Sequence, residues 1–203
     1  YSVDSNGEKL TKLGSDEVMP SGNFVISKDG SRLFFLGKTS QNNAPEIYMA
    51  GLGDNKELLQ ITNNEVFEND IDLSPDGRSL VYTAFKENSR DIFAIDITTL
   101  EESSVTTTEA YESTPQFSPD GKSLVFLRDD FNFGSRIVVL DLAKEVEKEI
   151  YKTSLAIKNI RWSGDSEKIA FTSERDGKNT LAVISKKGGE ETKLADNIGD
   201  CRY

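Results

Sequence analysis

The chain has 203 residues, of which 36% are hydrophobic and 29% charged, a composition typical of a globular protein with an apolar core. Its net charge of −11 argues against binding to nucleic acid or to an anionic membrane surface, because both need clustered Lys and Arg. The only cysteine, Cys201, and the absence of histidine exclude an internal disulfide, Ser-His-Asp chemistry and His-ligated metal sites within these residues.

Short strand-like segments run along the whole chain, beginning at residues 1–3 and 10–13. No apolar run approaches the ~20 residues of a membrane-spanning helix, so we expect no membrane insertion. Because strand-like sequence is present from Tyr1 onward, we expect that residues precede it in the natural protein.

A four-residue motif recurs four times, at spacings of 47, 44 and 45 residues. A fixed period in this range is the signature of a propeller or a solenoid. The copies are Ser27-Lys28-Asp29-Gly30, Ser74-Pro75-Asp76-Gly77, Ser118-Pro119-Asp120-Gly121 and Ser163-Gly164-Asp165-Ser166.

Each copy of the motif lies between two predicted strands, and two more strands follow it. The first strand alternates polar and apolar residues, the second and third are continuously apolar, and the fourth is short and polar. We name them strands a to d. Strand a covers residues 24–26, 71–73, 115–117 and 160–162, strand b 33–36, 80–83, 124–127 and 169–172, strand c 47–50, 92–95, 137–140 and 181–184, and strand d 103–106 and 192–194.

The Ser-Pro-Asp-Gly motif has the chemistry of a hairpin turn between strands a and b. Proline sets φ for a type I turn, aspartate tolerates the next position, and glycine takes the left-handed position that follows. We therefore interpret these aspartates as structural and not catalytic. The fourth copy has Ser166 in place of glycine, which predicts a strained turn or another turn type.

The predicted fold class is all-β: a β-propeller of four-stranded antiparallel blades, with about four full blades and partial blades at the ends. A β-sandwich gives no reason for a repeated sequence, and solenoid coils are usually shorter. Residues 144–148 could form a single helical turn within a c–d connection. The last apolar residues of strand a, at four equivalent positions, should be buried between blades: Ile26, Leu73, Phe117 and Trp162.

The domain organisation that follows is a single propeller domain, or a fragment of one, over residues 1–203. We expect a partial blade at 1–22, blades at about 23–69, 70–113, 114–158 and 159–199, and the start of a further blade at 200–203. A ring closed by these two ends would lack one central strand. We therefore expect either an open arc that other residues complete, or self-association through the incomplete blades.

The segments Leu73–Tyr82 and Phe117–Phe126 closely resemble the repeat of the TolB-like propeller family, a WD40-like type marked by Ser-Pro-Asp-Gly-Lys/Arg before an apolar strand. The resemblance covers nearly the whole chain. It implies a repeat protein with a propeller fold, as in TolB of the bacterial periplasm, in prolyl-oligopeptidase-like peptidases and in some polysaccharide lyases. It also implies a periplasmic or extracellular location.

The b–c connections differ most between repeats, and loops on a rigid scaffold are where binding residues tend to lie. The third connection holds Phe131 and Phe133. These rings either cap the adjacent blade or anchor a partner. The candidate partner-binding residues are Arg90, Arg128, Phe131, Phe133, Arg136 and Arg175.

Two functions remain open on sequence grounds. The first is a non-catalytic scaffold that binds a protein or peptide through its loop face. The second is the propeller domain of a larger prolyl-oligopeptidase-like peptidase or polysaccharide lyase, with catalysis elsewhere. We expect no catalytic residue and no cofactor, because the chain has no histidine, no Gly-x-Ser-x-Gly elbow and no phosphate-binding loop motif. We also expect no metal, because the spacing of Asp70, Asp72 and Asp76 departs from that of a calcium-binding loop.

Overall fold

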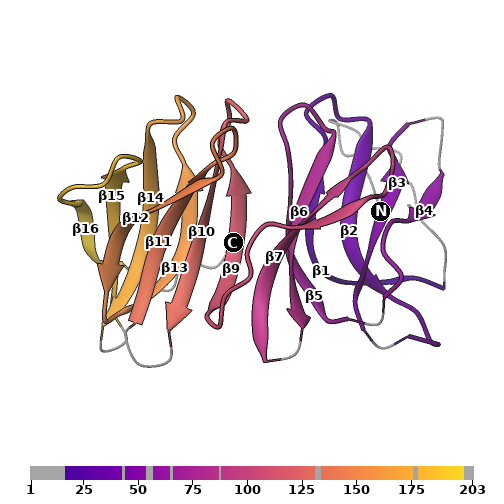
Figure 1. Cartoon of the computed structure of the whole chain (residues 1–203), viewed down its shortest axis with the longest axis horizontal. Coiled ribbons are helices and arrows are strands. Elements are labelled where there is room, and N and C mark those ends of the chain that lie inside the picture. The colour runs from indigo at the N-terminus through magenta and orange to yellow at the C-terminus, as the bar shows by residue number, and fades with distance from the viewer. Residues whose placement is uncertain are drawn as a thin grey trace.

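The computed structural model describes residues 17–42, 44–53, 57–64, 66–86, 88–130, 134–175 and 178–198. All regular secondary structure in these ranges is β-strand, and the strands form consecutive four-stranded antiparallel blades. Figure 1 shows the blades side by side in chain order along the long axis of the molecule. The described part holds no helix that is long and apolar enough to cross a membrane.

Within each blade, every strand pairs with the next one along the chain. The first blade contains β1 (Met19–Ile26), β2 (Arg32–Lys38), β3 (Glu46–Gly51) and β4 (Leu58–Gln60). The second contains β5 (Glu68–Leu73), β6 (Ser79–Lys86), β7 (Ser89–Asp96) and β8 (Glu102–Ser104). The third contains β9 (Tyr111–Phe117), β10 (Ser123–Asp130), β11 (Gly134–Asp141) and β12 (Val146–Thr153). The fourth contains β13 (Ala156–Trp162), β14 (Lys168–Arg175), β15 (Lys178–Ser185) and β16 (Thr192–Ile198).

The apolar core lies between neighbouring blades, as the two-sided apolar pattern of strands b and c predicts. Phe34 and Ile47 of the first blade pack with Tyr82 of the second. The next two interfaces repeat this arrangement. Ile92 and Phe126 belong to the cluster between the second and third blades, and Val125 and Phe171 to the cluster between the third and fourth. Residues 144–148 form no helix: Val146 already begins β12.

The four Ser-x-Asp turns are built alike. In each, the serine hydroxyl donates a 2.6 Å hydrogen bond to the aspartate two residues later. Gly30, Gly77 and Gly121 adopt φ values of 70–71°. Ser166 takes the same left-handed position with φ 61°, so the fourth turn is of the same type, and a side chain there carries backbone strain.

The prediction that four equivalent residues would all be buried is wrong for Ile26, which is 50% exposed. Leu73 is 8% exposed, whereas Phe117 and Trp162 are half-buried. Ile26 belongs to none of the apolar clusters between the described blades, whereas Phe117 and Trp162 line an open hollow that leaves part of each ring uncovered.

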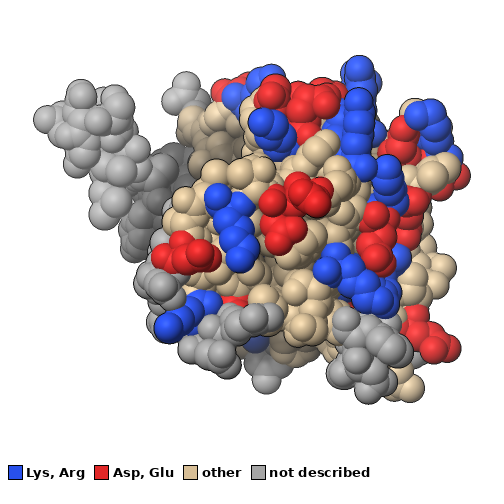
Figure 2. Space-filling model, turned by 90° about the vertical axis from the view of Figure 1, so that its left-hand side faces the viewer, with Lys and Arg blue, Asp and Glu red and all other residues tan. Residues whose placement is uncertain are grey.

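Figure 2 looks onto the end of the molecule formed by the fourth blade. Basic and acidic side chains are interspersed over this face, with uncharged residues between them. Such a mixed surface is well solvated. The open arc and the self-association expected from the sequence stay predictions.

Candidate functional site

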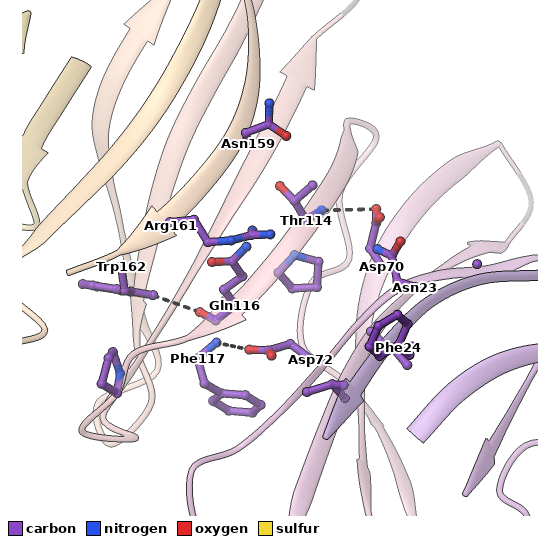
Figure 3. A pocket seen from close by; sticks show the side chains of 15 residues that line it. Asn23, Phe24, Asp70, Asp72, Thr114, Gln116, Phe117, Asn159, Arg161 and Trp162 are labelled. Carbon is purple, nitrogen blue, oxygen red and sulfur yellow. Dashed lines mark hydrogen bonds between the residues drawn. The ribbon is translucent and has the colours of Figure 1, made fainter. Parts of the chain in front are cut away.

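The innermost strands of all four blades, β1, β5, β9 and β13, line a hollow of about 1010 Å³. Its walls combine polar and apolar groups, and three aromatic rings lie among them, those of Phe24, Phe117 and Trp162 (Figure 3). Because each blade contributes equivalent residues, the wall of the hollow repeats every 44 to 47 residues. Equivalent positions of successive inner strands therefore carry chemically different side chains around the hollow.

Each of these strands is interrupted by a β-bulge in its pairing with strand b. In three of them the bulged residue is left-handed: Asp70 at φ 48°, Thr114 at 50° and Asn159 at 52°. Residues other than glycine rarely adopt this conformation, although Asp and Asn tolerate it best. Bulges re-aim side chains and concentrate beside functional sites, and all three residues line the hollow.

Hydrogen bonds between blades fix the wall of the hollow. Asp70 Oδ2 accepts from the Thr114 backbone N–H at 3.2 Å, and Asp72 Oδ2 accepts from the Phe117 N–H at 2.7 Å. The indole Nε1–H of Trp162 donates to the Gln116 carbonyl at 3.1 Å. Figure 3 shows these bonds running from one inner strand to the next.

Burial raises the pKa of Asp72 to about 6. The N–H groups of Phe117 and Leu73 and the positive charge of Arg161 lower it, but burial is the larger effect. Asp72 lies on β5 and Arg161 on β13, with β9 between them. The guanidinium therefore acts on the carboxylate across the hollow. At neutral pH the two walls carry opposite charges.

Three aromatic residues, Phe67, Phe85 and Tyr111, lie at the end of the blades where the b–c and d–a connections are found, and we name them the aromatic rim. Phe67 is 52% and Phe85 42% exposed. Phe85 packs edge-on against Tyr111 with ring centroids 5.5 Å apart, and the ammonium of Lys38 lies 5.3 Å from the Phe67 ring centre. The rim thus lies on the second and third blades, with Lys38 of the first blade against it.

Two buried carboxylates lie directly beside the rim: Glu68 is the first residue of β5 and Glu112 the second residue of β9. Glu68 accepts from Thr62 Oγ1 at 2.7 Å and from Asn64 Nδ2 at 2.9 Å. Burial raises its pKa to about 7. Glu112 accepts from Thr108 Oγ1 at 2.7 Å, and burial raises its pKa as well. These networks anchor the d–a connections that lead into β5 and β9.

The arginines predicted to bind a partner are engaged inside the fold. Arg128 bonds to Glu112 at 2.8 Å and to Glu147 at 2.8 Å, and Arg136 pairs with Glu149 at 3.3 Å. The Nε of Arg90 donates to the Glu112 carbonyl at 2.8 Å. Arg90 and Arg128 therefore converge on Glu112: the Arg90 bond joins the second blade to the third, and the Arg128 bonds lie within the third blade.

The other predicted residues cannot be placed in the same way. Phe131 and Phe133 lie outside the described residues, as does the side chain of Arg175, whose backbone ends β14. Their role in partner binding stays a prediction.

Sequence reasoning missed the aromatic rim. Its signal was present, because Phe67 and Tyr111 are aromatic, lie 44 residues apart and stand at the same place before strand a. The left-handed residues of the hollow gave no signal that separates them from ordinary strand residues. Among the described residues no group of three or more Cys, Asp or Glu side chains is arranged to hold a metal ion.

Solved structures with the same fold include several propellers. An Agrobacterium tumefaciens protein described as a TolB is 21% identical at a TM-score of 0.76, with 91% of this chain and 68% of that chain covered. TolB of Acinetobacter baumannii is 19% identical at 0.70, with 83% and 41% covered. An oligogalacturonate lyase of Vibrio parahaemolyticus is 17% identical at 0.70, with 95% and 58% covered.

This chain therefore spans only about half the length of the latter two proteins. Peptidases are also among the similar folds. No curated protein sequence matches the chain. The sequence does match the family described as the TolB beta propeller domain, over residues 12–202. With the repeated turns, the four-stranded blades and the shared fold, this match establishes that the chain belongs to the TolB beta propeller domain family.

Proposed function

We propose that this chain is a non-catalytic propeller scaffold that binds a peptide segment of a protein partner on the face formed by its b–c and d–a connections. The aromatic rim is the observation that carries the proposal. Phe67 and Phe85 expose much of their ring surface although a fully apolar core is available between the blades. Exposed aromatic rings on a rigid scaffold are the residues that most often anchor a partner.

The surroundings of the rim support this function. Tyr111 and Lys38 hold the rings from neighbouring blades, and the buried carboxylates Glu68 and Glu112 fix the connections beneath them. A pre-organised aromatic surface loses little conformational entropy on binding. A periplasmic or extracellular location belongs to the proposal and rests on the TolB resemblance alone.

The test is a selection of random peptides displayed on phage against the purified chain, followed by fluorescence anisotropy with the enriched peptides in synthetic form. The double variant Phe67→Ser/Phe85→Ser should bind these peptides at least about tenfold more weakly, since each anchor contributes roughly 1–2 kcal/mol. Leu194→Ser, an exposed apolar residue on β16, is the matched control. Equal binding by the rim variant, or a selection without enrichment, would overturn the proposal.

A second candidate is the propeller part of a larger lyase, favoured by the fold shared with the oligogalacturonate lyase and by the polar side chains that line the hollow. Its test is an assay of the full-length protein on oligogalacturonate with ultraviolet detection of the unsaturated product. Turnover that survives the rim variant would favour this candidate over the scaffold.

A further inference from the structure

The hollow is electrically polarised from one wall to the other. Equivalent positions on three successive inner strands carry Asp72 on β5, Gln116 on β9 and Arg161 on β13. A second set of equivalent positions carries Asp70 on β5 but uncharged Thr114 and Asn159 on the next two strands. Both carboxylates therefore belong to one wall, and the guanidinium belongs to the opposite wall.

These charged groups keep capacity for a ligand. Asp70 Oδ2 accepts from the Thr114 N–H and, at 3.4 Å, from Thr83 Oγ1. Asp72 accepts from the Phe117 N–H through Oδ2 and from the Leu73 N–H, and a carboxylate has room for further donors. Arg161 donates through one terminal nitrogen to the carbonyl of the adjacent Ile160 at 2.9 Å, and its side chain is exposed. Figure 3 shows Arg161 reaching from β13 toward β9 and the middle of the hollow.

The arrangement selects against ligands of a single charge. A polyanion is repelled by Asp70 and Asp72, and a purely cationic ligand is repelled by Arg161. A ligand with a positive and a negative group can satisfy both walls, and a partly enclosed site strengthens both attractions. The amide of Gln116, between the charged positions, offers a donor and an acceptor for a peptide backbone.

We propose that the hollow binds a peptide segment with a basic side chain held by Asp70 and Asp72 of β5 and an acidic side chain held by Arg161 of β13. The proposal rests on the proposed function, because it names the peptide chemistry that the scaffold takes at the hollow between its innermost strands.

Trp162 provides a direct readout of the hollow. It is the only tryptophan of the chain, it lines the hollow, and its indole N–H binds the Gln116 carbonyl. The ligands are four acetylated and amidated tetrapeptides: Lys-Ala-Ala-Glu, Lys-Ala-Ala-Gln, Gln-Ala-Ala-Glu and Gln-Ala-Ala-Gln. Titration at pH 7.5, about one and a half units above the pKa of Asp72, follows the tryptophan fluorescence.

Lys-Ala-Ala-Glu should bind most tightly, with a loss of roughly tenfold for each charge removed, the size of one charge-assisted hydrogen bond. Asp72→Asn keeps an acceptor for the Phe117 N–H but should reduce the preference for Lys over Gln, since only Asp70 then remains to hold the basic side chain. Arg161→Gln should abolish the preference for Glu over Gln. Lys193→Gln, a charge change on β16, is the control and should leave both preferences intact.

The outcomes separate this inference from the proposed function. Equal affinity for all four tetrapeptides, or preferences unchanged in Asp72→Asn and Arg161→Gln, would refute the polarised hollow. Failure of every tetrapeptide while phage-selected peptides still bind the rim refutes the inference and leaves the scaffold function standing. A neutral oligosaccharide that changes the Trp162 signal when no tetrapeptide does would assign the hollow to carbohydrate instead.

Discussion

The hydroxyl of Ser166 in the fourth blade accepts a hydrogen bond of 3.1 Å from the backbone N–H of Asp120 in the third. Ser166 stands where the other three turns have glycine, and it is 2% exposed with φ 61°. The strained conformation and the bond between blades therefore belong to the same residue. Serine is strained in this left-handed conformation, but its hydroxyl makes a hydrogen bond between blades that glycine cannot make.

This relationship predicts an order of stability for substitutions at Ser166. Ser166→Ala keeps the left-handed strain and loses the bond, so the free energy of unfolding should fall by about 1–2 kcal/mol. Ser166→Gly loses the bond but relieves a strain of roughly 1 kcal/mol, so it should be more stable than the alanine variant. Urea unfolding of the three proteins measures this order, and an alanine variant at least as stable as the glycine variant would contradict it.

The core prediction concerns Phe126, which is fully buried between the second and third blades. Phe126→Ala should lower the free energy of unfolding by about 3–5 kcal/mol, because it leaves a cavity. Phe24→Ala, at a ring that is 68% exposed, should change it by less than about 0.5 kcal/mol. Phe117→Ala should lie between them because Phe117 is half-buried. Denaturant midpoints that coincide for all three variants would exclude the described packing.

Glu68 predicts a pH dependence of stability. Burial raises its pKa from an ordinary 4.5 to about 7, so the folded chain holds this proton more tightly than the unfolded chain. The resulting stabilisation is fully present below pH 4.5 and is lost as the pH rises toward 7. Glu68→Gln mimics the protonated acid, with Thr62 as the partner of its amide.

Glu68→Gln should therefore stabilise the protein by up to ~3 kcal/mol at pH 8 and have little effect at pH 4. Thermal unfolding at both pH values checks this, with Glu101→Gln, at an exposed residue, as the control. A stabilisation of equal size at the two pH values would show that another effect of the substitution is responsible.

The turn aspartates predict the opposite pH dependence at more acidic values. Hydrogen bonds from the hydroxyl of Ser27 and from the backbone and hydroxyl of Ser31 lower the pKa of Asp29 from 3.8 to about 2. Its stabilisation is present above pH 3.8 and is lost as the pH falls through about 2. Asp29→Asn should lower the urea midpoint at pH 7 and lose this effect near pH 2. A deficit that persists at pH 2 would argue against the carboxylate.

The fold could be predicted from the sequence because its causes are local and repeated. The turns at Gly30, Gly77 and Gly121 follow from residue types with known φ preferences, and the two-sided burial of strands b and c follows from their continuous apolar runs. Even Ser166 adopts the glycine conformation, since the repeat geometry overrides the preference of a single residue.

The site could be predicted less well, because it depends on contacts between repeats. The sequence indicates that Arg128 lies near a loop, but not that Glu112, 16 residues earlier, engages it. Likewise, nothing local separates Asp72 from its counterparts Gln116 and Arg161. The opposite charges of Asp72 and Arg161 form one site only because the blades place both residues around the same hollow.

A single parallel bridge, between Arg90 of β7 and Tyr111 of β9, joins the second and third blades into one backbone-paired sheet. The first and fourth blades form no such ladder with their neighbours in the part of the chain that the structure describes. Repeat proteins open at their weakest interfaces. The middle pair should therefore behave as one cooperative unit with the slowest amide exchange, while the outer blades open separately. The basic wall on β13 would then move relative to the acidic wall on β5, and a ligand that bridges the two walls would slow amide exchange in the fourth blade.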